Sequence, residues 1–282
     1  MELLRKVIPV AMLSFVVSSM LAVGVSLTIG QIIAPLRKGR LVTLALLANF
    51  VLMPLGALAI AKLLRLDEPL GMALILLGAA AGAPFLPKLA GLAKSDLAFS
   101  VALMVLLMVL TVGYMPLVLP LLLEGVSVDA MGIARSLILL MLLPLGIGLL
   151  MKARLLQVAD RIRMPLNKLS SLSLAVLFTL LLVTNAKNVI SLFGTRGILA
   201  SVLFLFGGIA IGWLLGGPGF ETKGVLALGT AQRNIAAALL VGEKNFDDPK
   251  VLVMVVVVAV VGLLILMPMA RFLGSRNASK SA

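Results

Sequence analysis

The sequence predicts an all-α polytopic membrane protein, and three observations support this prediction. Hydrophobic residues make up 62% of the 282 residues, and the mean hydropathy is +1.22. Charged residues make up only 12%, about half the share that is usual in soluble domains. The apolar residues are also gathered in long segments, which reach the length of about 20 residues that an α-helix needs to cross a bilayer.

Nine segments meet this length rule and are predicted to be membrane-spanning helices. In chain order they are Val7–Ile33, Leu41–Leu64, Pro69–Leu92, Leu97–Leu123, Ala130–Met151, Leu169–Asn185, Gly197–Leu215, Gly224–Val241 and Val251–Leu273. The third and eighth spans are both interrupted and are predicted to run in opposite directions, as an inverted repeat requires. We therefore expect one transmembrane domain over residues 1–282, with repeats at about 7–123 and 169–273 and an extra span at 130–151.

The charge distribution predicts how the chain is oriented. The net charge is +13, and basic residues are concentrated in the predicted loops Leu36–Arg40 and Lys152–Lys168. Cytoplasmic loops of membrane proteins carry such an excess of Lys and Arg. We therefore expect the amino terminus outside, the carboxyl terminus inside, and a bacterial or archaeal inner membrane as the location. The lipid bilayer, rather than nucleic acid, is the expected partner, and no oligomeric state is predicted. The first apolar run is too long for a cleavable signal peptide.

Several kinds of site are excluded by the residue types. The chain contains no histidine and no cysteine, so the commonest general base and the thiolate metal ligands are absent. All eleven acidic residues lie in predicted loops or at predicted span ends. An intramembrane enzyme or a proton-coupled pathway would need such a group at membrane depth. We therefore expect no enzyme activity, no metal site and no cofactor, and we leave bound sodium open.

The third predicted span contains a break in its second half. Pro84 and Pro87 each remove a backbone N–H and disrupt the preceding turn, and Gly82 lies just before them. Unwound backbone at membrane depth needs protein or a water-filled cavity beside it. Lys88 follows directly and is predicted to bring its charge to a binding site there. The alternative is that Lys88 extends to the cytoplasmic interface.

The eighth predicted span carries four polar residues next to Gly229, namely Thr230, Gln232, Arg233 and Asn234. A guanidinium near the bilayer midplane costs roughly 2.5–3.5 kcal/mol to insert, so Arg233 is expected to face a packed interior or a wet cavity. All four side chains are predicted to bind substrate. The alternatives are that Arg233 bonds the freed carbonyls of the other broken helix, and that Gln232 and Asn234 only link helices.

Three runs of residues carry a resemblance to a known family. They are NFVLMP at 49–54, GAAAGAPFLPKLAGLAKSDLAFSVAL at 78–103 and GTAQRNIAAALL at 229–240, with Pro116 and Pro120 downstream of the second run. Together they resemble the bile acid:sodium symporter family in its nine-span form. The resemblance implies a core and a panel domain, two broken helices that cross in the core, an organic anion as substrate, and two sodium ions bound near the crossing.

The sodium ligands of that family carry over poorly to this chain. The family's glutamine on the second span falls at Asn49, and its Gln–Asn pair falls near Gln232, so these two are the expected ligands if sodium binds. The other positions that offer side-chain oxygen in the family fall on residues without it, namely Ala83–Pro84, Leu86, Pro87, Ala102, Met108 and Ala227 or Leu228. The resemblance therefore predicts the architecture more firmly than the sodium coupling.

The leading hypothesis is a secondary transporter of a small organic anion, in which Arg233 and Lys88 replace the coupling cations and attract the substrate. The predicted substrate contacts are Asn49, Lys88, Thr230, Gln232, Arg233 and Asn234, with backbone at Gly82, Pro84, Pro87 and Gly229. The alternative is a sodium-coupled symporter that binds ions through backbone carbonyls with Asn49, Gln232 and Asn234. Two further interpretations are a metalloid exporter, which would rely on a cysteine near the first break, and a membrane sensor or scaffold.

Overall fold

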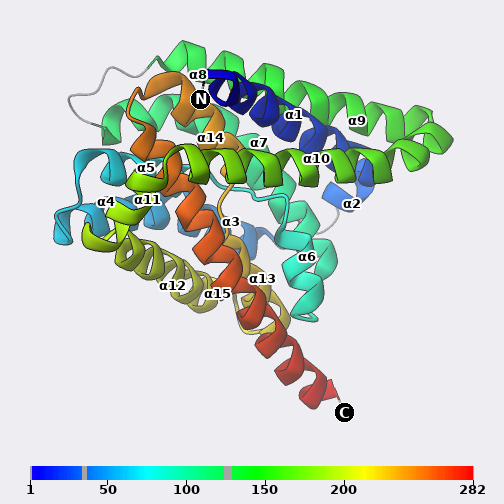
Figure 1. The fold of residues 1–282 in the computed structure, drawn as a ribbon. Coiled ribbons are helices and arrows are strands. Elements are labelled where there is room, and N and C mark those ends of the chain that lie inside the picture. Colours follow the sequence, from blue (N-terminus) through cyan, green and yellow to red (C-terminus); the bar gives the residue numbers. More distant parts are fainter. Residues whose placement is uncertain (1, 34–36, 124–128, 282) are drawn as a thin grey trace.

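The computed structural model describes residues 2–33, 37–123 and 129–281, and all regular structure in these residues is helical. The helices are α1 Glu2–Ser26, α2 Ile29–Ile33, α3 Gly39–Leu47, η2 Ala48–Leu52, α4 Met53–Leu63, α5 Glu68–Ala79, α6 Leu86–Leu92, α7 Leu97–Leu122, α8 Ala130–Leu137, η3 Ile138–Leu142, α9 Leu143–Arg154, α10 Leu156–Thr184, α11 Ala186–Gly194, α12 Gly197–Leu215, α13 Phe220–Ala231, α14 Ile235–Asn245 and α15 Pro249–Ser281. Figure 1 shows their arrangement.

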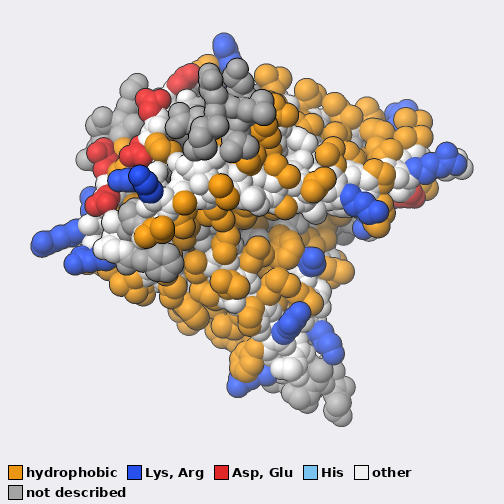
Figure 2. Space-filling view, in the orientation of Figure 1, with side chains coloured by type: hydrophobic (Ala, Val, Ile, Leu, Met, Phe, Trp, Pro, Cys, Tyr) orange, Lys and Arg blue, Asp and Glu red, His pale blue; other side chains and the backbone are white. Residues whose placement is uncertain are grey.

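The prediction of an all-α polytopic membrane protein is confirmed. Among the described residues, eight helical segments are long and apolar enough to cross a bilayer. The remaining predicted span, Pro69–Leu92, is divided into α5 and α6, and neither part is long enough to cross alone. Large apolar side chains are exposed along the helices, as expected for a surface that meets lipid. In Figure 2 apolar side chains cover much of the visible face, while most Lys and Arg side chains lie toward its edges.

The predicted start of the sixth span is wrong. Helix α10 begins at Leu156 rather than at Leu169, so most of the predicted basic loop Lys152–Lys168 is the first half of this helix. The hydropathy pattern ends at the basic residues, but Arg, Lys, Leu and Gln are good helix formers and continue the helix beyond the apolar segment. An ion pair between Lys152 and Asp160, with 2.6 Å between Nζ and Oδ1, connects α9 to the first turns of α10. The predicted boundaries at Leu36 and Glu124 lie outside the described residues.

In the described residues, two π-helical turns interrupt long spans, and each ends two residues before a proline. The turn η2 precedes Pro54, and η3 precedes Pro144. Proline has no N–H, so the carbonyl four residues earlier loses its usual helical partner. For Pro54 that carbonyl belongs to Phe50, and the hydroxyl of Tyr114 on α7 donates a hydrogen bond to it. The π-helical turn is thus anchored to the helix that packs beside it.

The helices form two groups, and a cavity lies between them. Helix α1 packs mainly against α10 and α9, and Figure 1 shows these three helices running side by side. The second group contains α5, α6, α7 and α12 to α15, which pack against one another around the two broken helices. This grouping places α1 and α10 opposite the helix breaks. The assignment of panel and core domains and the inverted repeat remain predictions.

Candidate functional site

Both predicted helix interruptions are present, and they meet. Helix α5 ends at Ala79 and α6 begins at Leu86, while α13 ends at Ala231 and α14 begins at Ile235. The backbone N–H of Asn234 donates to the carbonyl oxygen of Ala80 over 2.8 Å, which ties one break directly to the other. The crossing therefore joins two pairs of half-helices whose ends expose unpaired backbone groups.

The guanidinium of Arg233 lies at the centre of this crossing. Its side chain is almost fully buried, with 3% of its surface exposed. Nε donates to the carbonyl oxygen of Leu77 over 2.8 Å, and Nη2 donates to that of Gly78 over 2.6 Å. Nη1 donates to the carbonyl oxygen of Thr230 over 3.1 Å and to Oδ1 of Asn49 over 2.8 Å. One side chain therefore bonds the carboxyl-terminal ends of both α5 and α13.

These carbonyls lack their usual helical donors four residues later because the helices break, although the Leu77 carbonyl also accepts from the N–H of Ala80 over 3.1 Å. In a continuous helix the carbonyls of Leu77 and Thr230 would accept from the N–H groups of residues 81 and 234. The N–H of Ala81 instead donates to the hydroxyl of Thr111, and the N–H of Asn234 donates to the carbonyl of Ala80. Arg233 supplies the missing donors, and its positive charge faces the negative ends of two helix dipoles. This contact matches the alternative that the sequence left open, in which Arg233 bonds freed carbonyls.

Asn49 and Thr230 complete the surroundings of the guanidinium. Both residues are fully buried. Besides accepting from Arg233, the amide of Asn49 donates through Nδ2 to the carbonyl of Ala45 over 3.0 Å and to Oγ1 of Thr230 over 3.3 Å. The predicted residues Asn49, Thr230 and Arg233 are thus brought together in one hydrogen-bonded network, which joins η2 to the α13 break.

Thr111 is a buried polar residue of the crossing that the sequence analysis missed. Its hydroxyl, on α7, lies 3.1 Å from both the backbone N and the carbonyl oxygen of Ala81. The hydroxyl therefore bonds the backbone of the α5–α6 break at Ala81, whereas Arg233 bonds it at Leu77 and Gly78. A threonine three residues after Met108, near the middle of a mostly apolar span, was the available signal.

The predicted break residues have different roles. Gly82 has φ +78°, and a Cβ there would come within 2.2 Å of the backbone N of Met108, so only glycine fits this close approach to α7. Pro84 lies in the break and Pro87 is the second residue of α6, where its missing N–H costs no helical bond. Gly229 lies in the last turns of α13, and a Cβ there would come within 2.9 Å of the Leu86 side chain.

Lys88 does not join the crossing. It is exposed on α6, and its ammonium lies 5.1 Å from the centre of the Phe85 ring. Phe85 lines the cavity described below, whereas Lys88 does not. The structure therefore separates the two cations that the sequence analysis had placed together.

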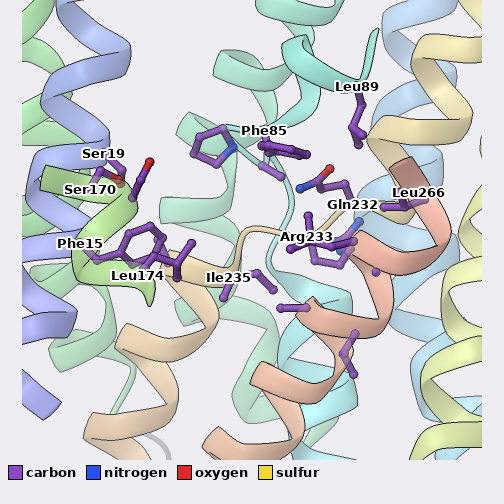
Figure 3. Close-up of a pocket in the computed structure, with 18 of the residues that line it drawn as sticks. Phe15, Ser19, Phe85, Leu89, Ser170, Leu174, Gln232, Arg233, Ile235 and Leu266 are labelled. Atoms are coloured by element: carbon purple, nitrogen blue, oxygen red, sulfur yellow. The ribbon is translucent and has the colours of Figure 1, made fainter. Parts of the chain in front are cut away.

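A cavity of about 310 Å³ opens beside the crossing, between the break segments, α15, α1 and α10. Most of its lining is apolar, and its polar lining residues are Ser19, Asn167, Ser170, Ser171, Gln232 and Arg233. Figure 3 shows Ser19 and Ser170 on one side of the cavity and Gln232 and Arg233 on the other. The α1 and α10 residues were missed because single hydroxyls in apolar helices usually bond their own backbone, as Ser19 does to Val16.

Two amide groups at the second break keep a free polar atom. Oε1 of Gln232 and Nδ2 of Asn234 are buried without a hydrogen-bond partner within the described part of the chain. Oδ1 of Asn234 accepts from the N–H of Ala237 and caps α14. Buried polar atoms usually find partners, so the free acceptor and the free donor indicate a place for a ligand or water. Gln232 also lines the cavity, as predicted for a substrate contact.

Among the described residues, no ion pair includes Arg233. The ion pairs found there join Lys38 to Asp96 and Lys152 to Asp160. The described residues also contain no group of three acidic, His or Cys side chains that could hold a metal ion. Backbone carbonyls and the Asn49 amide therefore provide the negative side of the interaction.

Comparison with known proteins shows the family. The model of the Sodium Bile acid symporter family matches residues 12–192, which is more than half of the chain. The chain belongs to this family. A protein of rice (Oryza sativa subsp. japonica), “Probable sodium/metabolite cotransporter BASS2, chloroplastic”, is 26% identical over 238 residues, covering 83% of this chain and 57% of the rice protein. The “Hepatic sodium/bile acid cotransporter” of rat (Rattus norvegicus) is 28% identical over 204 residues, covering 70% of this chain and 56% of the rat protein.

The membership confirms the resemblance and the class of protein. The family consists of transporters rather than enzymes. The chain spans less than two thirds of the length of the two relatives named above, at 57% and 56%. Arg233 lies beyond residue 192, where the family match ends, so its proposed role rests on its contacts alone.

Proposed function

We propose that this protein is a secondary transporter of a small organic anion, in which the guanidinium of Arg233 takes the place of a bound sodium ion. The four hydrogen bonds of Arg233 to carbonyls and to Asn49 carry this proposal. Carbonyl and amide oxygens are hard ligands of the kind that alkali cations prefer, and here they surround a covalently attached cation. Transport would then proceed without sodium, by uniport or exchange.

The substrate would bind in the cavity next to the crossing. The apolar lining suits a small carbon skeleton, and the permanent charge of Arg233 favours an anion even though its N–H groups bond mainly to protein. Gln232 and the hydroxyl of Ser170 provide neutral hydrogen-bonding groups on opposite sides. The two named relatives are sodium cotransporters of metabolites and bile acids, and a small carboxylate lies within that chemical class.

Lys88 has a smaller role in this proposal. Its exposed ammonium lies next to Phe85, at the edge of the cavity, where it would attract anions over a distance without binding them. We also propose that the amino terminus lies outside and the carboxyl terminus lies in the cytoplasm of a prokaryotic cell, because basic residues gather at the end of α9 and in the first half of α10.

The deciding test compares sodium binding by the wild-type protein and by Arg233→Ala. Thermal unfolding of each purified protein is measured in sodium and in choline at equal ionic strength, since a ligand of the folded state raises its stability. Sodium should leave the Tm of the wild-type protein unchanged. It should raise the Tm of Arg233→Ala, because removing the guanidinium frees the carbonyls that it occupies.

The matched control is Arg135→Ala, which removes an exposed arginine of α8 and should show no sodium response. In liposomes, uptake of a panel of small carboxylates by the wild type should persist after sodium is replaced by choline. A sodium-specific rise in the Tm of the wild type, or loss of all uptake without sodium, would refute the proposal.

The second candidate is a sodium-coupled symporter. The free buried acceptor Oε1 of Gln232 favours it, since that atom is available to a cation. In this case Gln232→Leu would abolish sodium stabilisation of the wild-type protein. The same thermal measurements therefore separate the two candidates.

A further inference from the structure

A second pocket lies where terminal segments of three helices meet. Its volume is about 900 Å³, and it is bounded by the start of α3, the end of α12 and the start of α13. Its basic lining residues are Lys38, Arg40 and Lys223, and its leucines include Leu41, Leu44 and Leu214. No acidic residue of the described ranges lines it. We call this site the basic pocket.

The positive charge of the basic pocket is only partly neutralised. Lys38 forms an ion pair with Asp96, with 2.6 Å between Nζ and Oδ2. Arg40 and Lys223 form no ion pair with an acidic residue in the described part of the chain. The ammonium of Lys223 lies 5.7 Å from the centre of the Trp213 ring, so this contact holds it at the edge of the pocket while its charge persists. Two positive charges therefore remain for an anion.

The surroundings indicate that the basic pocket lies at the membrane surface. Trp213, in the last turn of α12, packs edge-on against Phe220 at the start of α13, with ring centres 5.0 Å apart. Tryptophan is enriched at the boundary between hydrocarbon and water. Leu214 is 79% exposed next to Trp213, which is expected where acyl chains cover the protein. Charge and apolar surface are thus combined at the depth of lipid head groups.

We propose that the basic pocket binds an anionic phospholipid. Its phosphate would interact with Arg40 and Lys223, and an acyl chain would lie along Leu41, Leu44 and Leu214. Basic pockets between membrane helices recognise lipid phosphate in this way. A free phosphate ion would use only the charges, whereas the leucines favour a ligand that also has a hydrocarbon chain. The proposal does not depend on the transported substrate or on the role of Arg233.

The test measures lipid binding to the full-length protein by native mass spectrometry. The purified protein is incubated in detergent with equal amounts of phosphatidylglycerol and phosphatidylcholine. Phosphatidylglycerol should bind preferentially, and the double variant Arg40→Gln/Lys223→Gln should bind it roughly 30-fold more weakly, because two charges near the head group are lost. The charge-conserving variant Arg40→Lys/Lys223→Arg should retain binding, which separates lost charge from lost structure.

The matched control is Arg161→Gln/Arg163→Gln, which removes two exposed charges from α10, outside the basic pocket. This variant should bind phosphatidylglycerol like the wild type. The proposal fails if the control loses binding equally, if phosphatidylcholine binds as well as phosphatidylglycerol, or if the Gln double variant retains wild-type binding. It also fails if millimolar inorganic phosphate displaces the lipid, because the site would then recognise the free ion.

Discussion

Arg233 and Lys88 are both cations beside a helix break, yet they lie in opposite environments. Arg233 is 3% exposed and bonds three carbonyls and one amide, whereas Lys88 is exposed and lies over an aromatic ring. The backbone near each residue explains the difference. Arg233 meets the carboxyl-terminal ends of α5 and α13, where free carbonyls attract a donor. Lys88 is in the first turn of α6, where free backbone groups are N–H donors and the helix dipole repels a cation.

A buried cation is thus stabilised by the carboxyl-terminal end of a helix, where free carbonyls and the helix dipole are negative. Residue type contributes as well, because the planar guanidinium presents several donors in fixed directions and can bond carbonyls of two helices at once. An ammonium group in the same place has only three donors on a flexible stem. The structural contribution of Arg233 should therefore be much larger than that of Lys88.

The largest expected effect comes from removing each cation in turn. Arg233→Ala should lower the stability by about 3 kcal/mol or more, since each buried acceptor left without a partner costs about 1–3 kcal/mol. Lys88→Ala should change it by less than about 0.5 kcal/mol, as for most surface substitutions. Reversible unfolding in mixed detergent micelles measures both, and Arg233→Lys should be intermediate. Equal losses for the two alanine variants would contradict the comparison.

An intermediate loss of stability is expected when the support of the α5–α6 break by Thr111 is removed. Thr111→Val keeps the shape of the side chain but leaves the buried N–H and carbonyl of Ala81 without a partner. The stability should fall by about 1–3 kcal/mol. Thr179→Val is the matched control, because Thr179 is exposed on α10. If both variants lose the same free energy of unfolding, Thr111 does not stabilise the break.

The smallest effect is expected for the exposed ion pair between Lys38 and Asp96. Partial burial raises the pKa of Asp96, but hydrogen bonds from Lys38 and from the N–H of Phe99 outweigh it and hold the pKa below 3.8. The folded state therefore favours the carboxylate, so its stabilising contribution is present above pH 3.8 and is lost as the pH falls below this value. Asp96→Asn should remove this part of the acid dependence, measured as the difference in Tm from the wild type. A difference that does not shrink toward low pH would contradict the assignment.

Much of the fold could be predicted from the sequence, because its signals are properties of short stretches of the chain. Long apolar segments indicated the membrane helices, and Gly82, Pro84 and Pro87 indicated the first break because their backbone properties do not depend on distant contacts. The start of α10 could not be predicted from hydropathy, since its basic first half is helical without being apolar. The cavity residues Ser19 and Ser170 lie on different helices, and nothing in the sequence indicates that they face Gln232.

The membrane class, the family resemblance, the positions of both breaks and the arginine in the second break follow from the sequence. They depend on composition and on short-range backbone chemistry. The bonds of Arg233 to Leu77, Gly78 and Asn49, and the exposure of Lys88, follow from the packing of the helices. The physical reason is that a side chain's partners in the crossing come from helices more than 150 residues away in the chain, and their directions are set by how those helices pack.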